Sequence, residues 1–171
     1  MTHLAESSTP QLGISSDRQV YDHIGALCRV IAPGAMSGGA FSIVEERAQS
    51  GYMAPRHVHA REAETFLVLD GALEGWSGGT TQMVEAGNLV FLPAGVEHAF
   101  RVVSATAHFL TLITPAGFET FFEESGTPLS QDFSGELPAP YPLTPEQGAA
   151  LQSVLTPLGC TITGPPPFLL G

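Results

Sequence analysis

Three histidines and one glutamate have the residue types and the spacing of a metal-binding site. One residue separates His57 from His59, and Glu64 and His98 follow later in the chain. Alternate side chains of a β-strand point to the same face, so a strand would bring the imidazoles of His57 and His59 together. The segment before Glu64 is long enough for a tight turn, so Glu64 opens the next strand and can face the same centre. The spacing therefore predicts a shell of three imidazole nitrogens and one carboxylate oxygen.

Such a shell suits a divalent transition metal. Neutral imidazoles and a carboxylate accept iron, nickel, manganese, cobalt or zinc about equally well, so the residue types do not select the ion. Four protein ligands leave about one or two coordination positions for water, substrate or dioxygen. Glu62 is close enough in sequence to be an alternative ligand, but the spacing favours Glu64, and we expect Glu62 and Glu45 to be solvated. The site is therefore predicted to be catalytic in type.

The residues beside the ligands predict an apolar wall. Residues two positions from a ligand in a strand share its face. The candidates for substrate contact found in this way are Met53, which precedes the turn-prone Pro55, and Phe66 and Phe100. Such a wall suits a flat apolar ligand with a few polar groups. The alternative is that these side chains only fill a small barrel.

The other histidines and both cysteines have structural explanations. His108 lies in an apolar run, where we expect a strand histidine with a hydrogen-bond partner. His3 and His23 belong to no constellation of chemical groups. Cys28 lies in a hydrophobic strand and is expected in the core, and Cys160, near the end of the chain, is expected to be inert.

Charge and composition limit which classes of ligand and macromolecule the protein can bind. The chain of 171 residues has a formal net charge of -11, and all six of its basic residues are arginine. The lack of lysine excludes Schiff-base chemistry and a P-loop, and the acidic balance argues against nucleic acid as a partner. Anionic ligands would be repelled at long range, so a neutral or weakly acidic organic ligand is favoured.

The sequence also predicts where the protein resides. The polar start of the chain, residues 1–16, has no signal-peptide pattern, and the two cysteines form no CxxC motif. No apolar stretch approaches the roughly 20 residues of a membrane-spanning helix. We therefore expect a cytoplasmic protein with reduced thiols and no membrane partner.

Short apolar or alternating runs punctuated by glycine and proline predict an all-β fold with a barrel core at about 19–115. The expected strands are 19–22, 26–32, 40–47, 64–70, 82–85, 89–92, 98–103 and 107–114. The extension 116–171 should hold a short helix with packed phenylalanines Phe118, Phe121 and Phe122, ended by Gly126. A proline-rich surface connection should follow, then a helix over 144–155 with a capping box, and a rigid proline tail at 164–167. We expect one domain over 1–171.

Two glycine-bounded motifs contain the four candidate ligands. The first reads G-x5-H-x-H-x4-E-x6-G over 51–71, and the second reads G-x5-P-x-G-x2-H over 87–98. They resemble the two motifs of the cupins, in the same order. The segment LITPAGFETFF at 112–122 and the GPPP at 164–167 are further similar to small single-domain bacterial cupins related to quercetin 2,3-dioxygenase. One departure is Val102, which stands where the second motif often ends in asparagine.

This resemblance implies a double-stranded β-helix, or jelly-roll barrel, with a metal on His57, His59, Glu64 and His98, and a homodimer. It also implies a dioxygenase that cleaves a flavonol or a similar aromatic substrate, with Glu64 as the catalytic proton acceptor. Two alternatives stay open. One is a different cupin enzyme, such as another oxygenase, a lyase or an isomerase acting on a small metabolite. The other is a cupin that binds metal or ligand without turnover.

Overall fold

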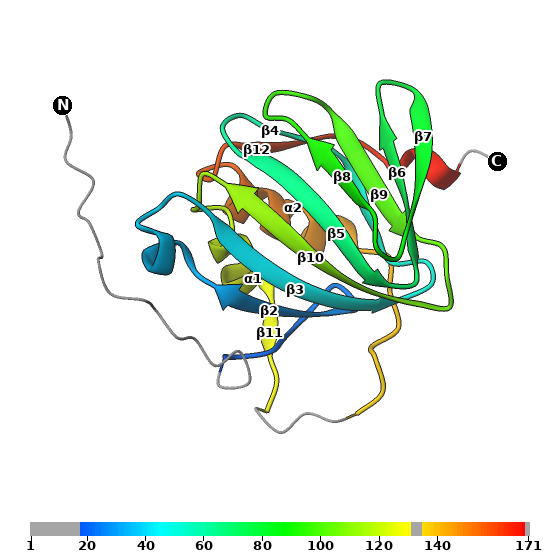
Figure 1. Cartoon of the computed structure of the whole chain (residues 1–171), viewed down its shortest axis with the longest axis horizontal. Helices are drawn as coiled ribbons and strands as arrows, with labels where there is room; N and C mark the ends of the chain where they lie inside the picture. Colours follow the sequence, from blue (N-terminus) through cyan, green and yellow to red (C-terminus); the bar gives the residue numbers. More distant parts are fainter. Residues whose placement is uncertain (1–17, 131–134, 170–171) are drawn as a thin grey trace.

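Two antiparallel sheets form the protein, with short helices from the end of the chain packed beside them (Figure 1). The computed structural model describes residues 18–130 and 135–169, so the polar start of the chain and His3 lie outside the described residues. One sheet has the strand order β11-β1-β2-β3-β10-β5-β8, and the other has the order β12-β4-β9-β6-β7. The expected all-β jelly roll with short C-terminal helices is confirmed.

The strands of the larger sheet are β1 (Tyr21–His23), β2 (Ala26–Ala32), β3 (Ser42–Gln49), β5 (Ala63–Asp70), β8 (Leu89–Leu92), β10 (Thr106–Thr114) and β11 (Thr127–Pro128). Those of the smaller sheet are β4 (Met53–His59), β6 (Ala72–Ser77), β7 (Thr80–Glu85), β9 (His98–Val102) and β12 (Cys160–Gly164). The helices are α1 (Thr120–Ser125) and α2 (Pro145–Leu155), with short 3-10 turns at Gly34–Ser37 and Pro167–Leu169.

The core lies between the inner faces of the two sheets. Alternate residues of the central strands are buried, as Val44 on β3, Val68 on β5 and Phe109 on β10 show. This period of two is the pattern of a sheet with one face in the core and one in solvent. It explains why alternation in the sequence located most of these strands.

Strand prediction succeeded where the alternation was strong and failed elsewhere. The strands at 26–32 and 89–92 have the expected bounds, and the other expected strands differ at their ends by one to a few residues. Four strands lie outside the expected ranges, namely β4, β6, β11 and β12, although the spacing of His57 and His59 was read as that of a strand. β6 has one fully buried side chain, Leu73, and contains Gly75, so its local signal is weak.

β12 corrects the prediction that the end of the chain is only a proline tail. It pairs antiparallel with β4, so that Cys160 lies opposite His59 and Ile162 lies opposite His57. Only the proline segment after Gly164 leaves the sheet. The C-terminal segment is therefore part of the wall that carries two of the candidate ligands.

The two helices were predicted with nearly correct bounds. α2 begins with a capping box between Thr144 and Gln147 and has Pro145 at its first position, as expected. α1 is capped at its end by Gly126, although Phe118 precedes the helix instead of lying in it. α1 packs on β1 and on α2, and α2 packs on β12. No helix in residues 18–130 and 135–169 is long and apolar enough to cross a membrane.

Candidate metal centre and its cavity

The four candidate ligands come from both sheets. His57 and His59 lie at the end of β4, and His98 is the first residue of β9, directly opposite His57 in the pairing of these strands. Glu64 is near the start of β5 in the larger sheet. Pro55 was expected to mark a turn, but it lies inside β4 at an irregularity of the register between Ala54 and His57. The cluster therefore joins the two sheets at one end of the core.

The ligand atoms of these four side chains converge. One nitrogen or oxygen of each lies within 4.8 Å of those of the others. Oε2 of Glu64 is 3.2 Å from Nε2 of His98 and 3.4 Å from Nε2 of His59. Glu64, His59 and His98 are buried, and His57 is half-buried. Three imidazole nitrogens and one carboxylate at this spacing fit a divalent transition metal.

Backbone carbonyls orient two of the imidazoles. Nδ1–H of His57 donates to the carbonyl of Pro55 at 2.8 Å, and Nδ1–H of His98 donates to the carbonyl of Val96 at 2.9 Å. Each bond holds its ring with Nε2 directed away from the carbonyl, which is the orientation that metal-bound histidines adopt. The rings of His59 and Phe118 pack edge to face, with their centroids 4.2 Å apart.

The charge states also fit a metal. Burial, reinforced by nearby His98, lowers the pKa of His57 to about 4. Burial by itself would raise the pKa of Glu64, but hydrogen bonds with His59 and His98 outweigh it and hold this pKa well below its usual range. A neutral imidazole and an ionised carboxylate are the forms that bind metals.

Glu62 and Glu45 were expected to be solvated, and this is wrong for both. Glu62 is buried, and its Oε1 lies 3.1 Å from Nη2 of the exposed Arg61. It is not part of the histidine cluster, so the structure brings Glu64 and not Glu62 to the histidines. Glu45 is half-buried and lies 2.9 Å from Nε2 of His108, which confirms that His108 is a strand histidine with a partner.

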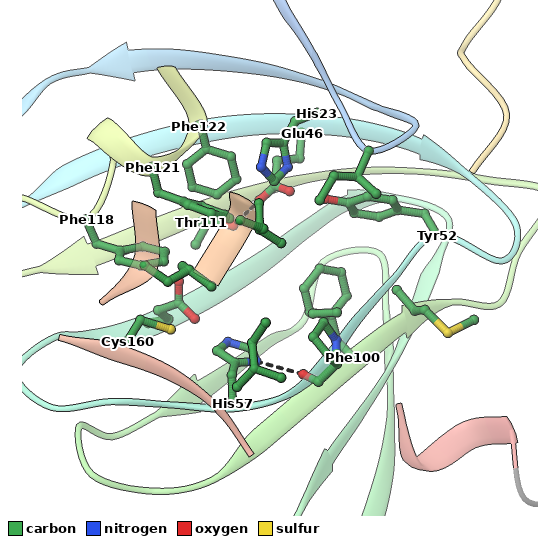
Figure 2. A pocket seen from close by; sticks show the side chains of 18 of the residues that line it. His23, Glu46, Tyr52, His57, Phe100, Thr111, Phe118, Phe121, Phe122 and Cys160 are labelled. Atoms are coloured by element: carbon green, nitrogen blue, oxygen red, sulfur yellow. Dashed lines mark hydrogen bonds between the residues drawn. The ribbon is translucent and has the colours of Figure 1, made fainter. Parts of the chain in front are cut away.

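A cavity of about 90 Å³ lies beside the cluster, between the sheets and the helices (Figure 2). His57 and Glu64 line it, together with all three residues proposed from strand alternation, Met53, Phe66 and Phe100. The C-terminal extension adds Phe118, Phe121, Phe122, Leu151, Leu155, Cys160 and Ile162. The three phenylalanines were expected only to pack, but they also form a wall of this cavity.

Cys160, which was expected to be inert, lies buried on β12 against the cluster. Its Sγ is 4.0 Å from Nε2 of His59. Burial, with a smaller contribution from the charges of Glu64 and Glu62, raises the pKa of this thiol to about 12. The thiol therefore stays protonated at neutral pH, which leaves the three histidines and Glu64 as the better ligands.

A second polar group of the cavity was not found from the sequence. His23, Glu46, Tyr52 and Thr111 line the part of the cavity away from His57 (Figure 2). Thr111 Oγ1 donates to Oε1 of Glu46 at 2.6 Å, and burial raises the pKa of Glu46 to about 8. A signal was present, because Glu46 lies two residues from the apolar Val44 and therefore on the buried face of its strand.

The raised pKa of Glu46 predicts a pH dependence of stability. Its carboxyl stays protonated in the folded protein to about pH 8, whereas its ordinary value is 4.5. Between these values the folded state binds more protons than the unfolded chain, so the free energy of unfolding falls as the pH rises. Glu46→Gln removes this loss. We expect the stability of the variant relative to the wild type to increase between about pH 5.5 and about pH 8.5.

Urea unfolding of the metal-free proteins at both pH values measures this difference. Cys28, Tyr52, Thr111 and Glu64 are the groups around the Glu46 carboxyl, and they are the same in both proteins. Glu45→Gln, on the neighbouring half-buried position, is the control and should follow the wild type. If the free energies of unfolding of Glu46→Gln and the wild type instead changed in parallel with pH, Glu46 would be ionised in the folded protein.

Comparison with known proteins supports the cupin resemblance. The cupin domain model matches residues 44–113. A quercetin 2,3-dioxygenase of Bacillus subtilis strain 168 is 26% identical over 128 residues, which are 75% of this chain and 38% of that protein. The chain thus spans little more than a third of the length of this curated relative.

Solved structures share the fold. KdgF from a Halomonas species superposes with a TM-score of 0.57 at 17% identity, over 64% of this chain and 99% of that one. A mutant oxalate decarboxylase of Bacillus subtilis superposes with a TM-score of 0.55 at 20% identity, over 68% of this chain and 33% of that one. At these identities the likeness concerns the fold alone.

The matched region contains the four clustered side chains and both histidine motifs. Its strands belong to both antiparallel sheets, which β1, β2, β11 and β12 complete from outside the matched region. Motifs, sheet architecture and comparisons agree, and the resemblance stated from the sequence is confirmed. Residues 44–113 are therefore similar to a cupin domain.

Proposed function

We propose that this protein is a metal-dependent dioxygenase that cleaves a hydroxylated aromatic substrate, with a flavonol such as quercetin as the first compound to test. The observation that carries the proposal is the opening of the histidine and glutamate cluster onto a cavity with aromatic walls. The curated relative named quercetin 2,3-dioxygenase supports the same reaction type. A small aromatic molecule and dioxygen would be the partners of the protein.

His57, His59, Glu64 and His98 would hold one divalent ion of iron, nickel, manganese, cobalt or zinc. When bound, this ion supplies a Lewis acid with open coordination positions. Glu64 is ionised and its Oε2 lies between His59 and His98, so it can accept the proton of a substrate hydroxyl that enters the cluster. This makes Glu64 the proposed catalytic residue.

Met53, Phe66 and Phe100 would position the substrate. Phe66 and Phe100 are buried, and their ring centroids lie 4.9 Å apart on one side of the cavity. Packing of a substrate ring against them would exclude water and limit its orientation. Met53 is half-buried and also lines the cavity. The aromatic pair would therefore hold the ring, and Met53 would border its entrance.

The size of the cavity favours a second candidate function. About 90 Å³ holds no more than about one aromatic ring, and a flavonol has a larger body. A different cupin enzyme that acts on a small metabolite, such as a lyase, an isomerase or another oxygenase, fits this volume better. A flavonol would need the half-exposed side near Met53 and Ile162 to accommodate its other rings.

An oxygen electrode separates these functions. Protein reloaded separately with iron, manganese, cobalt, nickel and zinc is mixed with quercetin and, in parallel, with single-ring hydroxylated aromatics. We expect oxygen uptake with at least one of the metals, and none without metal. Substrate loss without oxygen uptake would indicate a lyase or an isomerase. No uptake with any ion at full occupancy would exclude the dioxygenase.

A further inference from the structure

The end of the cavity away from the metal cluster holds polar groups that the proposed reaction does not use. His23 on β1 and Glu46 on β3 are 3% and 2% exposed, and both line the cavity. Figure 2 shows them with Thr111 and Tyr52 at one end of the cavity, while His57 lies at the other. Buried polar groups facing an apolar cavity lose hydration unless they find a partner.

A chain of hydrogen bonds fixes the tautomer of His23. The hydroxyl of Ser125 donates its one proton to the carbonyl of Phe121 at 2.6 Å. The Ser125 oxygen lies 2.9 Å from Nε2 of His23, so this nitrogen must be the donor. Burial lowers the pKa of His23 to about 4, which keeps the ring neutral. Nδ1 of His23 is therefore an unprotonated acceptor.

This acceptor has no partner. Nδ1 of His23 is buried and makes no hydrogen bond with any residue of the described ranges 18–130 and 135–169. The rings of Phe121 and Phe122 pack against the imidazole with centroids 4.8 Å and 5.2 Å away, and they offer it no proton. An unpaired acceptor at this depth costs free energy that a ligand with a proton to donate would recover.

Glu46 and Tyr52 supply the opposite half of a recognition site. The two side chains hydrogen-bond each other, and burial raises the pKa of both groups, so both carry a proton at neutral pH. One hydrogen bond between two such groups uses one of their two protons. Thr111 donates to the carboxyl and takes up no proton from it. One proton of this pair therefore remains to be donated.

We propose that His23 and Glu46 form a second recognition site, which binds a hydroxyl group of a neutral aromatic ligand. The hydroxyl donates to Nδ1 of His23 and accepts the remaining proton of Glu46 and Tyr52. Phe66, Phe100 and Phe122 enclose the ring between the two ends of the cavity. The site rests on the proposed function for the metal end, and together they define the substrate class as a neutral ring with oxygen substituents at both ends.

The chemistry of this site excludes several ligands. A carboxylate could not donate to His23 and would place its charge beside Glu46. A plain hydrocarbon ring would fit the walls and leave the polar groups unpaired. A hydroxyl both donates and accepts, and it is the smallest group that satisfies the two protein groups at once.

Binding of phenol and toluene to the zinc-loaded full chain, followed by protein NMR titration, tests this inference without turnover. The two compounds have nearly the same shape and differ in the hydroxyl. We expect phenol to bind about tenfold more tightly than toluene, because two buried polar groups gain a partner. The preference should be lost in Glu46→Leu and in His23→Phe. It should persist in Glu45→Leu, the same change on the neighbouring strand position.

Removal of the metal site tells the two ends of the cavity apart. If the phenol hydroxyl lies at His23 and Glu46, the preference persists in His98→Ala and in zinc-free protein. A preference lost in His98→Ala but retained in Glu46→Leu and His23→Phe would place the hydroxyl at the metal and overturn the inference. Equal binding of the two compounds, or no binding, would also overturn it.

Failure of the oxygen-electrode assay would contradict the proposed function. It would not affect the preference for phenol over toluene, which tests the second site alone. If Glu46→Leu does not fold, His23→Phe decides.

Discussion

Replacement of His98 by alanine should lower the affinity of the protein for zinc by about 100-fold or more. His98 is buried, its Nε2 faces Glu64, and its Nδ1 is held by the carbonyl of Val96, so its loss removes one positioned ligand of the cluster. Isothermal titration with zinc and metal analysis after dialysis against a chelator measure the loss. The same result is expected for His57→Ala.

His108→Ala is the matched control for this experiment. It removes another strand histidine, but one that pairs with Glu45 outside the cluster. Its affinity for zinc should equal that of the wild type. Retention of stoichiometric zinc by His98→Ala under the same dialysis would refute the assignment of the ligands.

Replacement of Glu64 by glutamine should reduce turnover by about 10²- to 10⁴-fold with the fold intact. Glutamine keeps the shape of the side chain but cannot accept a proton or carry the negative charge that His59 and His98 stabilise. The rate of oxygen uptake, compared at equal metal occupancy, separates this effect from weaker metal binding. Circular dichroism should be unchanged.

Glu62→Gln is the control for Glu64→Gln. Glu62 is also buried, and it lies two residues away, yet it pairs with Arg61 and not with the histidines. Its uptake rate should stay close to that of the wild type. A wild-type rate in Glu64→Gln would exclude Glu64 as the proton acceptor.

Local rules explain why His57, His59 and Glu64 could be predicted from the sequence, whereas His98 lies on β9 and was found through the second motif. The spacing of His57 and His59 needs only the period of a strand, and Glu64 follows after a short turn. Gly71, the last residue of the first motif, has a φ of 77°, and a β-carbon there would collide with the backbone oxygen of Thr106. Short-range geometry of this kind is visible in the spacing of residues.

The rest of the cavity could not be predicted, because it depends on contacts between distant segments. Cys160 reaches His59 only through the pairing of β12 with β4, and nothing near Cys160 in the sequence indicates this pairing. The acceptor atom of His23 depends on Ser125, which is 102 residues away. Glu62 was expected to be solvated because it is charged, but the fold buries it. Such features can be recognised only when the pairing of distant segments is known.

The late position of β12 in the chain has a consequence for protein synthesis. The candidate metal ligands lie between residues 57 and 98, whereas α1, α2 and β12, which cover the cavity, follow from residue 120 onward. Because a chain grows from its N-terminus on the ribosome, all four ligands are made before their cover. Metal can therefore reach a nascent barrel that is still open on this side, and the last segment made closes the cavity.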